Sequence, residues 1–251
     1  MDPLLTERQA AILACVVDAY VETAQPVGSG TLSTAYGLGV SPATVRSEMA
    51  RLESLGLLTH PHTSAGRVPT VAGYRYFVKH LMQSAELSEA EELTIRHQFH
   101  QAGANDERWM RLSAAVVAHT SGLAGLVAAE RREDAPVVLY HAGLTHILSV
   151  PEFADNSRLR AIVEILEHGL GLAPVFERLP QRGVQVIIGG EPPLDALPDV
   201  SLVLSRFGAP ADGARGVLGV VGPTRLSYDR AVPTVRFVAS LVTELITANA
   251  A

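Results

Sequence analysis

The chain has 251 residues, just under half of them apolar, and a formal net charge of −6. This composition predicts one or two folded domains and excludes a largely disordered chain. The single cysteine, Cys15, excludes a disulfide framework within the chain and favours a reducing compartment. Because we find neither a signal-peptide pattern nor a run of about 18 apolar residues, we expect a soluble, cytoplasmic protein with no membrane partner.

The charge is unevenly distributed. Residues 1–80 carry six basic and six acidic side chains, whereas residues 81–251 carry 14 arginines against 20 acids. A nucleic-acid-binding protein need not be basic overall if its positive side chains gather on one face. A merely neutral first domain is the alternative, and charge alone does not decide between them.

Three helices are predicted in the first 56 residues. Thr6 with Gln9 forms a capping box before an apolar stripe, and Pro26 ends that helix. Ser29 is expected to cap a short second helix, which the glycines of "YGLGV" interrupt. Ser41, followed by Pro42, caps a third helix. The inward faces of the first and third helices are Ile12, Leu13, Val16, Val17, Tyr20 and Val21, and Val45, Met49, Leu52 and Leu55.

The stretch "PHTSAGRVPT", residues 61–70, holds almost nothing that a core would accept. Short extended pieces, "LLTH" and "RVP", flank it, and Thr70 begins a fourth helix, "VAGYRYFVKHLM". The order helix, short helix, tight turn, helix, two-stranded ribbon, helix predicts a winged helix-turn-helix. The polar stretch is then the tip of the wing.

The third helix has the composition of a recognition helix. Ser41 and Thr44 offer hydroxyls to phosphates or base edges, Arg46 can bridge to a guanine edge, and Arg51 suits a backbone phosphate. In the wing, Arg67 can enter a minor groove or bind phosphate, and His62, Thr63 and Ser64 suit backbone contacts. The alternatives are an ordinary surface helix and a solvated hairpin.

The rest of the chain predicts further helices and strands. Residues 86–120 form an amphipathic helix pair, with Ser88 and Glu91 as a capping box, which serves as a linker or as a dimer interface. From residue 121 onward, strands and helices alternate and end in a long helix, so we expect an α+β, sensor-like domain.

Enzyme motifs and metal sites are not indicated. The chain lacks G-x-S-x-G, Walker A and H-E-x-x-H patterns. His97 and His100 share a helix face without an obvious third ligand, so we expect no metal and no cofactor. Glycines at positions 213, 216, 219 and 222 are better explained by close packing in a strand than by a phosphate-binding loop.

Three segments resemble a known family: "RQAAILACVVDAYVETAQPVGSGTL", "SPATVRSEMARLESLGLL" and "PHTSAGRVPTVAGYRYFV" are similar to the N-terminal domain of the heat-inducible transcription repressor (HrcA) family. Later segments, "GLTHILSVPEFAD", "VIIGGEPPLDAL" and "VLGVVGPTRLSYDRAVPTVRFVASLVTEL", resemble it as well. The resemblance implies a winged helix-turn-helix at 1–82, a helical linker or dimerisation element at 86–120, and a GAF-like α/β domain at 121–251.

The resemblance also implies a function. Members of such a family would repress chaperone operons, bind an inverted-repeat operator as a homodimer, and depend on a chaperonin for their activity. The matching motifs carry over DNA contacts to Ser41, Thr44, Arg46, Ser47 and Arg51, and to His62, Thr63, Ser64 and Arg67. Two features depart from the family: Gly30 stands where a lysine or arginine is usual, and the inserted dimerisation domain is missing.

Two other functions remain open at this point. A ligand-responsive regulator would use the C-terminal domain to bind a small molecule, and would need a pocket with convergent polar groups. An interaction module that has lost DNA binding would be a monomer without operator affinity.

Overall fold

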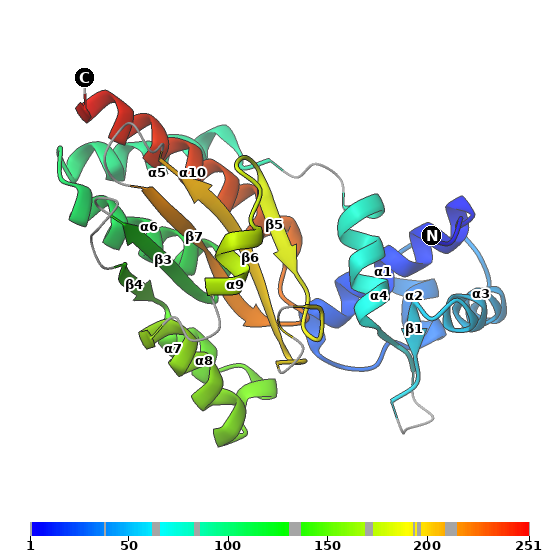
Figure 1. The fold of residues 1–251 in the computed structure, drawn as a ribbon. Helices are drawn as coiled ribbons and strands as arrows, with labels where there is room; N and C mark the ends of the chain where they lie inside the picture. The colour runs from blue at the N-terminus through cyan, green and yellow to red at the C-terminus, as the bar shows by residue number, and fades with distance from the viewer. Residues whose placement is uncertain are drawn as a thin grey trace. The chain divides into compact units, whose positions relative to one another are not determined.

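The computed structural model describes residues 2–37, 39–61, 66–82, 86–130, 137–168, 173–192, 194, 197–208 and 215–250. The chain divides into two compact units, Met1–Ser84 and Ala85–Ala251 (Figure 1). Each unit is described by itself.

The first unit has the predicted order of elements. Its elements are α1 (Glu7–Thr23), α2 (Ser29–Ala35), α3 (Pro42–Ser54), β1 (Leu58–Thr59), β2 (Val68–Pro69), α4 (Val71–Tyr76) and the π-helical turn η1 (Phe77–Leu81). The predicted fourth helix therefore changes from α to π geometry at Phe77.

Local capping explains where these helices begin. Thr6 and Gln9 form the predicted capping box of α1, and the hydroxyls of Ser41 and Thr70 accept N–H groups in the first turns of α3 and α4. Ser29, however, is the first residue of α2, and the cap position belongs to Gly28. Gly37 and Gly39 have φ values of 57° and 64°, as the predicted turn requires.

Apolar side chains from α1, α2, α3 and β1 fill the core of this unit. The buried set contains Ile12, Leu13, Val16, Val17, Leu32, Val45, Met49, Leu52, Leu57 and Leu58. Leu55 was expected to join it, but it is 43% exposed at the C-cap position, one residue beyond the end of α3.

The wing is a small antiparallel ribbon in which Leu58 pairs with Pro69 and Thr59 with Val68. A third segment joins it, since Val27 and Arg67 exchange two backbone hydrogen bonds of 2.9 and 3.0 Å. A Cβ at Gly66 would lie 2.8 Å from the Val27 carbonyl carbon, so glycine permits this close approach.

The second unit consists of a five-stranded sheet and its covering helices. Its elements are α5 (Glu89–Gln101), α6 (Asp106–Ser121), β3 (Ala124–Glu130), β4 (Val138–Ala142), α7 (Leu144–Leu148), the 3₁₀ turn η2 (Pro151–Phe153), α8 (Asn156–His168), α9 (Ala173–Arg178), β5 (Val184–Ile187), β6 (Val200–Phe207), β7 (Arg215–Pro223) and α10 (Tyr228–Ala250). The predicted α+β class is confirmed.

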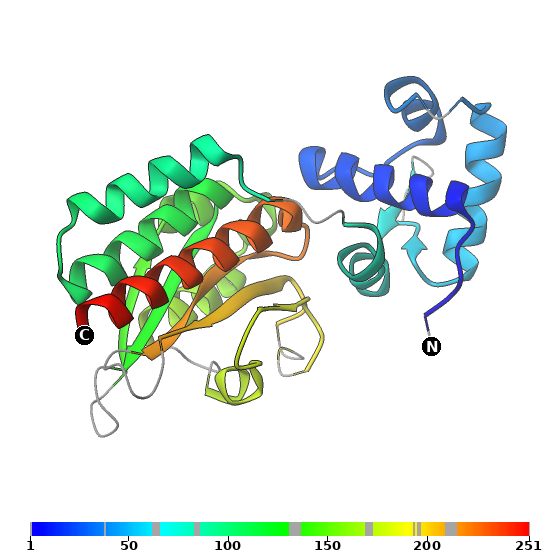
Figure 2. The same cartoon turned by 90° about the horizontal axis from the view of Figure 1, so that it is seen from above.

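The sheet has the strand order β4-β3-β7-β6-β5, and all of its neighbours are antiparallel. Helices α6 and α10 pack on it and on each other, and α5 packs on α6, so the three form one layer on one side of the sheet (Figure 2). The helix pair predicted between 86 and 120 is thus part of the second unit.

Close strand packing explains three of the recurring glycines. A Cβ at Gly219 would lie 2.0 Å from the Val203 carbonyl oxygen, and one at Gly216 would lie 2.1 Å from that of Ala128. At Gly222 it would meet the Leu123 side chain at 2.6 Å. Gly213 lies outside the described residues.

Helix α10 is long and apolar enough, by length and composition, to cross a membrane. Its apolar face is nevertheless used inside the protein, because Val235, Val238 and Val242 are fully buried where α10 packs on α6, β6 and β7. It is therefore the core helix of the second unit.

Candidate nucleic-acid interface

The exposed face of α3 has small side chains along its centre and charged side chains on both flanks. Val45, Met49 and Leu52 point inward, and at 100° per residue the opposite face is made of small residues. These exposed residues are Ala43, Ser47, Ala50 and Ser54. Such a face lets a helix backbone approach the floor of a major groove, which is about 12 Å wide.

The two arginines of α3 lie on opposite flanks of this face. Both Arg46 and Arg51 are exposed. Helical spacing places Arg46 on the flank of Glu53, and Arg51 on the flank of Glu48, near Arg8 in a surface hollow. Both carboxylates of α3 already have partners: Glu48 accepts from Gln9 Nε2 at 3.0 Å, and Glu53 binds the wing. Glu53 is therefore paired with a guanidinium, whereas Glu48 keeps its charge on the flank of Arg51, because Gln9 is neutral.

Ser41 and Thr44 lie together at the N-terminus of α3. Ser41 Oγ accepts the N–H of Thr44 at 3.2 Å and lies 3.0 Å from Thr44 Oγ1. Ser41 is exposed and Thr44 is half-buried. The pair thus combines a structural cap with hydroxyls that face solvent beside the positive end of the helix dipole.

Of the four wing residues predicted to contact DNA, the structure describes only Arg67. His62, Thr63 and Ser64 lie outside the described residues. Arg67 is described, but its side chain is only 12% exposed. Its Nε donates to Glu53 Oε2 at 3.0 Å, and its Nη2 forms an ion pair with the same oxygen at 3.0 Å.

Glu53 and His60 are two residues that sequence reasoning missed. Glu53 stands in the last turn of α3, and its second carboxylate oxygen is bonded to His60 Nδ1 at the end of β1. The bonds from His60, followed by those from Arg67, lower the pKa of Glu53 below its ordinary value of 4.5. One carboxylate on α3 therefore binds a side chain from each side of the wing.

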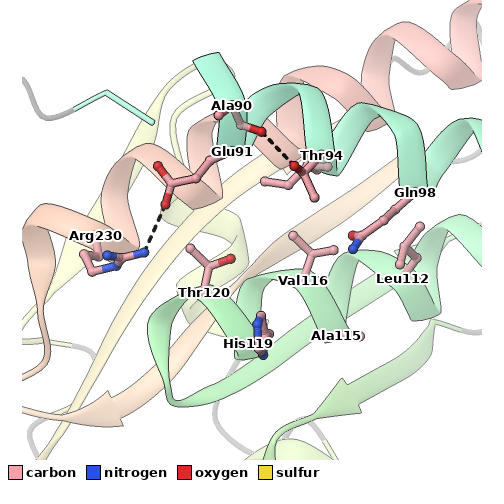
Figure 3. Close-up of a pocket in the computed structure, with 11 residues that line it drawn as sticks. Ala90, Glu91, Thr94, Gln98, Leu112, Ala115, Val116, His119, Thr120 and Arg230 are labelled. Atoms are coloured by element: carbon pink, nitrogen blue, oxygen red, sulfur yellow. Dashed lines mark hydrogen bonds and ion pairs between the residues drawn. The ribbon is translucent and has the colours of Figure 1, made fainter. Parts of the chain in front are cut away.

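A groove in the second unit is the other candidate site. It has a volume of about 570 Å³ and runs between α5 and α6 (Figure 3). Ile95, Val116 and Leu112 give it apolar walls, and Glu91 with Arg230 closes one end by an ion pair of 3.2 Å. Hydrogen bonds from Ser88, followed by the charge of Arg230, lower the pKa of Glu91.

Metal ligands do not cluster in this chain as far as the structure describes it. Within those residues, no group of three His, Cys, Asp or Glu side chains stands close enough to hold a metal ion. His97, one of the two histidines considered above, is hydrogen-bonded to Gln101 at 2.8 Å.

Two family models match the chain. One, described as the winged helix-turn-helix transcription repressor HrcA DNA-binding domain, matches residues 4–83, and the other, the HrcA protein C-terminal domain, matches residues 70–232. The chain belongs to the HrcA family. Members of this family are transcription repressors, so the prediction of a DNA-binding regulator rather than an enzyme is confirmed.

HrcA relatives align with nearly the whole chain. The heat-inducible transcription repressor HrcA of Chloroflexus aurantiacus is 35% identical over 351 residues, covering 96% of this chain and 94% of the relative. That of Thermomicrobium roseum is 35% identical over 337 residues, covering 98% and 97%. Because both alignments are longer than this chain, the relatives contain residues that have no counterpart here.

A solved structure has the same fold as this HrcA chain. It is the crystal structure of a hypothetical protein at 2.2 Å resolution, with a TM-score of 0.83 and 18% identity, covering 98% of this chain and all of the other.

Proposed function

We propose that this repressor binds an inverted-repeat DNA operator as a homodimer and thereby represses heat-shock chaperone operons, in the cytoplasm of a bacterium and on its nucleoid DNA. The observation that carries the proposal is the exposed face of α3, where small residues separate Arg46 from Arg51 and the carboxylate on the flank of Arg46, Glu53, is paired with Arg67. In helix-turn-helix proteins the second helix of the motif lies in the major groove, and here that helix is α3.

The candidate contacts divide by chemistry. Arg46, on one flank, would form bidentate hydrogen bonds to a guanine edge, and Ser47, at the centre, would reach a base or the backbone. Arg51, Ser41 and Thr44 would bind phosphates, which fix the register of the helix on the duplex. This division makes Arg46 the main source of sequence discrimination.

An inverted-repeat operator has two-fold symmetry, and a homodimer matches that symmetry. One α3 reads a single half-site, whereas two copies related by a two-fold axis read an inverted repeat. The family resemblance supports both this assembly and modulation by a chaperonin. In that scheme a marginally stable repressor is lost on warming and restored by the chaperonin, since one or two kcal/mol is a large fraction of a typical folding free energy.

Light scattering on the purified chain, with and without a palindromic duplex, tests the proposal. We expect a complex of two chains per duplex. The duplex is best taken from a randomised pool, by selection with the chain itself. Failure to recover any duplex that binds more tightly than its scrambled version would refute sequence-specific repression.

A second candidate function is supported by the groove between α5 and α6. Its volume of about 570 Å³ lies within the range usual for small-molecule sites, and apolar walls with a few polar groups at the rim are typical of such sites. In this reading the second unit is a GAF-like sensor whose ligand changes DNA affinity.

A thermal-shift screen against a metabolite panel tests the second candidate. Thr94→Trp is a suitable control, because Thr94 lines the groove from an exposed position on α5. A compound that stabilises the unaltered chain but not this variant would support the sensor. Equal responses in both chains, or none in either, would contradict it.

A further inference from the structure

The wing and α3 are joined by one carboxylate. Glu53 Oε2 accepts a hydrogen bond from Arg67 Nε and forms an ion pair with Nη2, and Oε1 is hydrogen-bonded to His60. Arg67 precedes β2 directly and His60 follows β1 directly. Glu53 therefore holds both sides of the wing at its base, and we call the three residues the wing clamp.

The backbone of Arg67 is fixed as well. It exchanges two hydrogen bonds with Val27, just before α2, and Gly66 lies too close to Val27 for any side chain. Arg67 thus joins three elements: the entry to α2 through its main chain, β2 by its place in the sequence, and the end of α3 through its guanidinium. A residue connected in this way has little freedom to turn toward DNA.

The charges around Arg67 also favour a structural role for its side chain over a contact with DNA. A phosphate that binds Arg67 must reach donors that Glu53 leaves open and must compete with the charge of that carboxylate, on a side chain that is only 12% exposed. Arg46, by contrast, is exposed and lies on the same flank of α3 as Glu53, two turns away. The clamp therefore sets the wing beside the flank that presents Arg46.

We infer that Glu53 is a positioning residue for DNA recognition: it binds Arg67 and His60 so that the wing is held at a fixed place beside α3, and Arg67 acts through this clamp rather than by contacting DNA. This inference rests on the proposed function for its effect on DNA binding. The clamp itself has a readout that does not need DNA.

Three variants distinguish a positioning role of Arg67 from a direct contact with a DNA phosphate. Glu53→Gln removes the charge but keeps the shape, Arg67→Gln removes the guanidinium, and the double variant removes both. Glu48→Gln is the matched control, because it removes the same charge from the same helix but has Gln9 as its partner instead of the wing. DNA affinity is measured on a duplex selected from a randomised pool by the unaltered chain, as a function of salt.

The positioning role predicts that Glu53→Gln and Arg67→Gln each weaken binding by about tenfold, and that the double variant loses no more than the worse single one. The slope of log affinity against log salt stays unchanged in Arg67→Gln.

A phosphate contact predicts instead that Arg67→Gln lowers the slope by about 0.9. It also predicts that Glu53→Gln binds as well as or more tightly than the unaltered chain, because a negative charge is gone. That pair of results would overturn the inference.

Hydrogen exchange of the N–H groups of Arg67 and Val27 tests the clamp without DNA. We expect at least severalfold faster exchange in Glu53→Gln and no change in Glu48→Gln. Unchanged exchange in Glu53→Gln would overturn the inference, whatever the DNA data. If the unaltered chain binds no duplex while exchange responds as expected, the proposed function and the recognition role fail together, and the clamp stands only as a structural element.

Discussion

Ser41 Oγ lies 3.0 Å from Thr44 Oγ1 and also accepts the N–H of Thr44, so one hydroxyl pair both caps α3 and stands at its exposed N-terminus. This arrangement combines a structural role with the proposed DNA-binding role in the same two residues. Substitutions that keep one role and remove the other can separate them.

We predict that Ser41→Ala lowers the free energy of unfolding of the first unit by about 1 kcal/mol, because the cap is lost. Ser41→Asp keeps the cap, since aspartate is an equally good N-cap and is favoured by the helix dipole. It should nevertheless weaken DNA binding more than Ser41→Ala, because its carboxylate repels phosphate. Hydrogen exchange and mobility-shift titrations measure the two effects. Equal DNA affinity in both variants would exclude a phosphate near Ser41.

We predict that Arg46→Ala reduces the sequence preference of DNA binding, whereas Arg51→Ala reduces the affinity for all duplexes. Loss of a bidentate guanine contact reduces the preference for the selected duplex over a scrambled one by roughly 1–3 kcal/mol. Loss of a phosphate contact weakens binding to both duplexes alike and lowers the salt slope by about 0.9. Titrations on both duplexes at several salt concentrations distinguish these cases. Similar losses on both duplexes for both variants would contradict the division between base and phosphate contacts.

Gly30→Lys should strengthen DNA binding. Gly30 is exposed in the first turn of α2, and an added Cβ meets nothing within 4 Å. The first helix of a helix-turn-helix crosses the DNA backbone, so a lysine there is expected to add one phosphate contact and to raise the salt slope by about 0.9.

Gly30→Ala is the control for that prediction, since it improves the helix without adding charge. If both variants bind DNA equally tightly, position 30 does not face the backbone.

The contribution of Glu53 to stability should depend on pH. Its pKa is lowered in the folded chain from the ordinary 4.5. Its stabilising effect is therefore fully present above about pH 4.5 and is lost as pH falls through the lower, folded-state pKa. The difference in Arg67 amide protection between the unaltered chain and Glu53→Gln should shrink in that window. A difference that grows as the pH is lowered would show the opposite linkage.

Local chemistry made much of the first unit predictable. The caps at Thr6, Ser41 and Thr70 and the turn glycines act over three or four residues, and the sequence displays them directly. Ser29 and Leu55 were each misjudged at a helix boundary: Ser29 is the first residue of α2 instead of its cap, and Leu55 is the C-cap of α3 instead of a core residue.

Contacts between distant residues were not predictable in the same way. Arg67 suggested a DNA contact because an arginine in a polar loop usually faces solvent. Its partner Glu53 lies 14 residues earlier, on another element, and only the fold brings them together. The helix pair after residue 86 showed its apolar faces clearly, but periodicity alone cannot name the surface that covers them. That surface includes the sheet and α10.

Chemical-shift mapping of the full chain with a selected duplex tests the central claim most directly, because it reports which residues meet DNA. We predict that the largest changes occur from Ser41, the N-cap of α3, to Arg51, with smaller changes in α2 and the wing. Changes confined to the second unit, or an α3 that does not respond to a duplex that the chain binds, would contradict it.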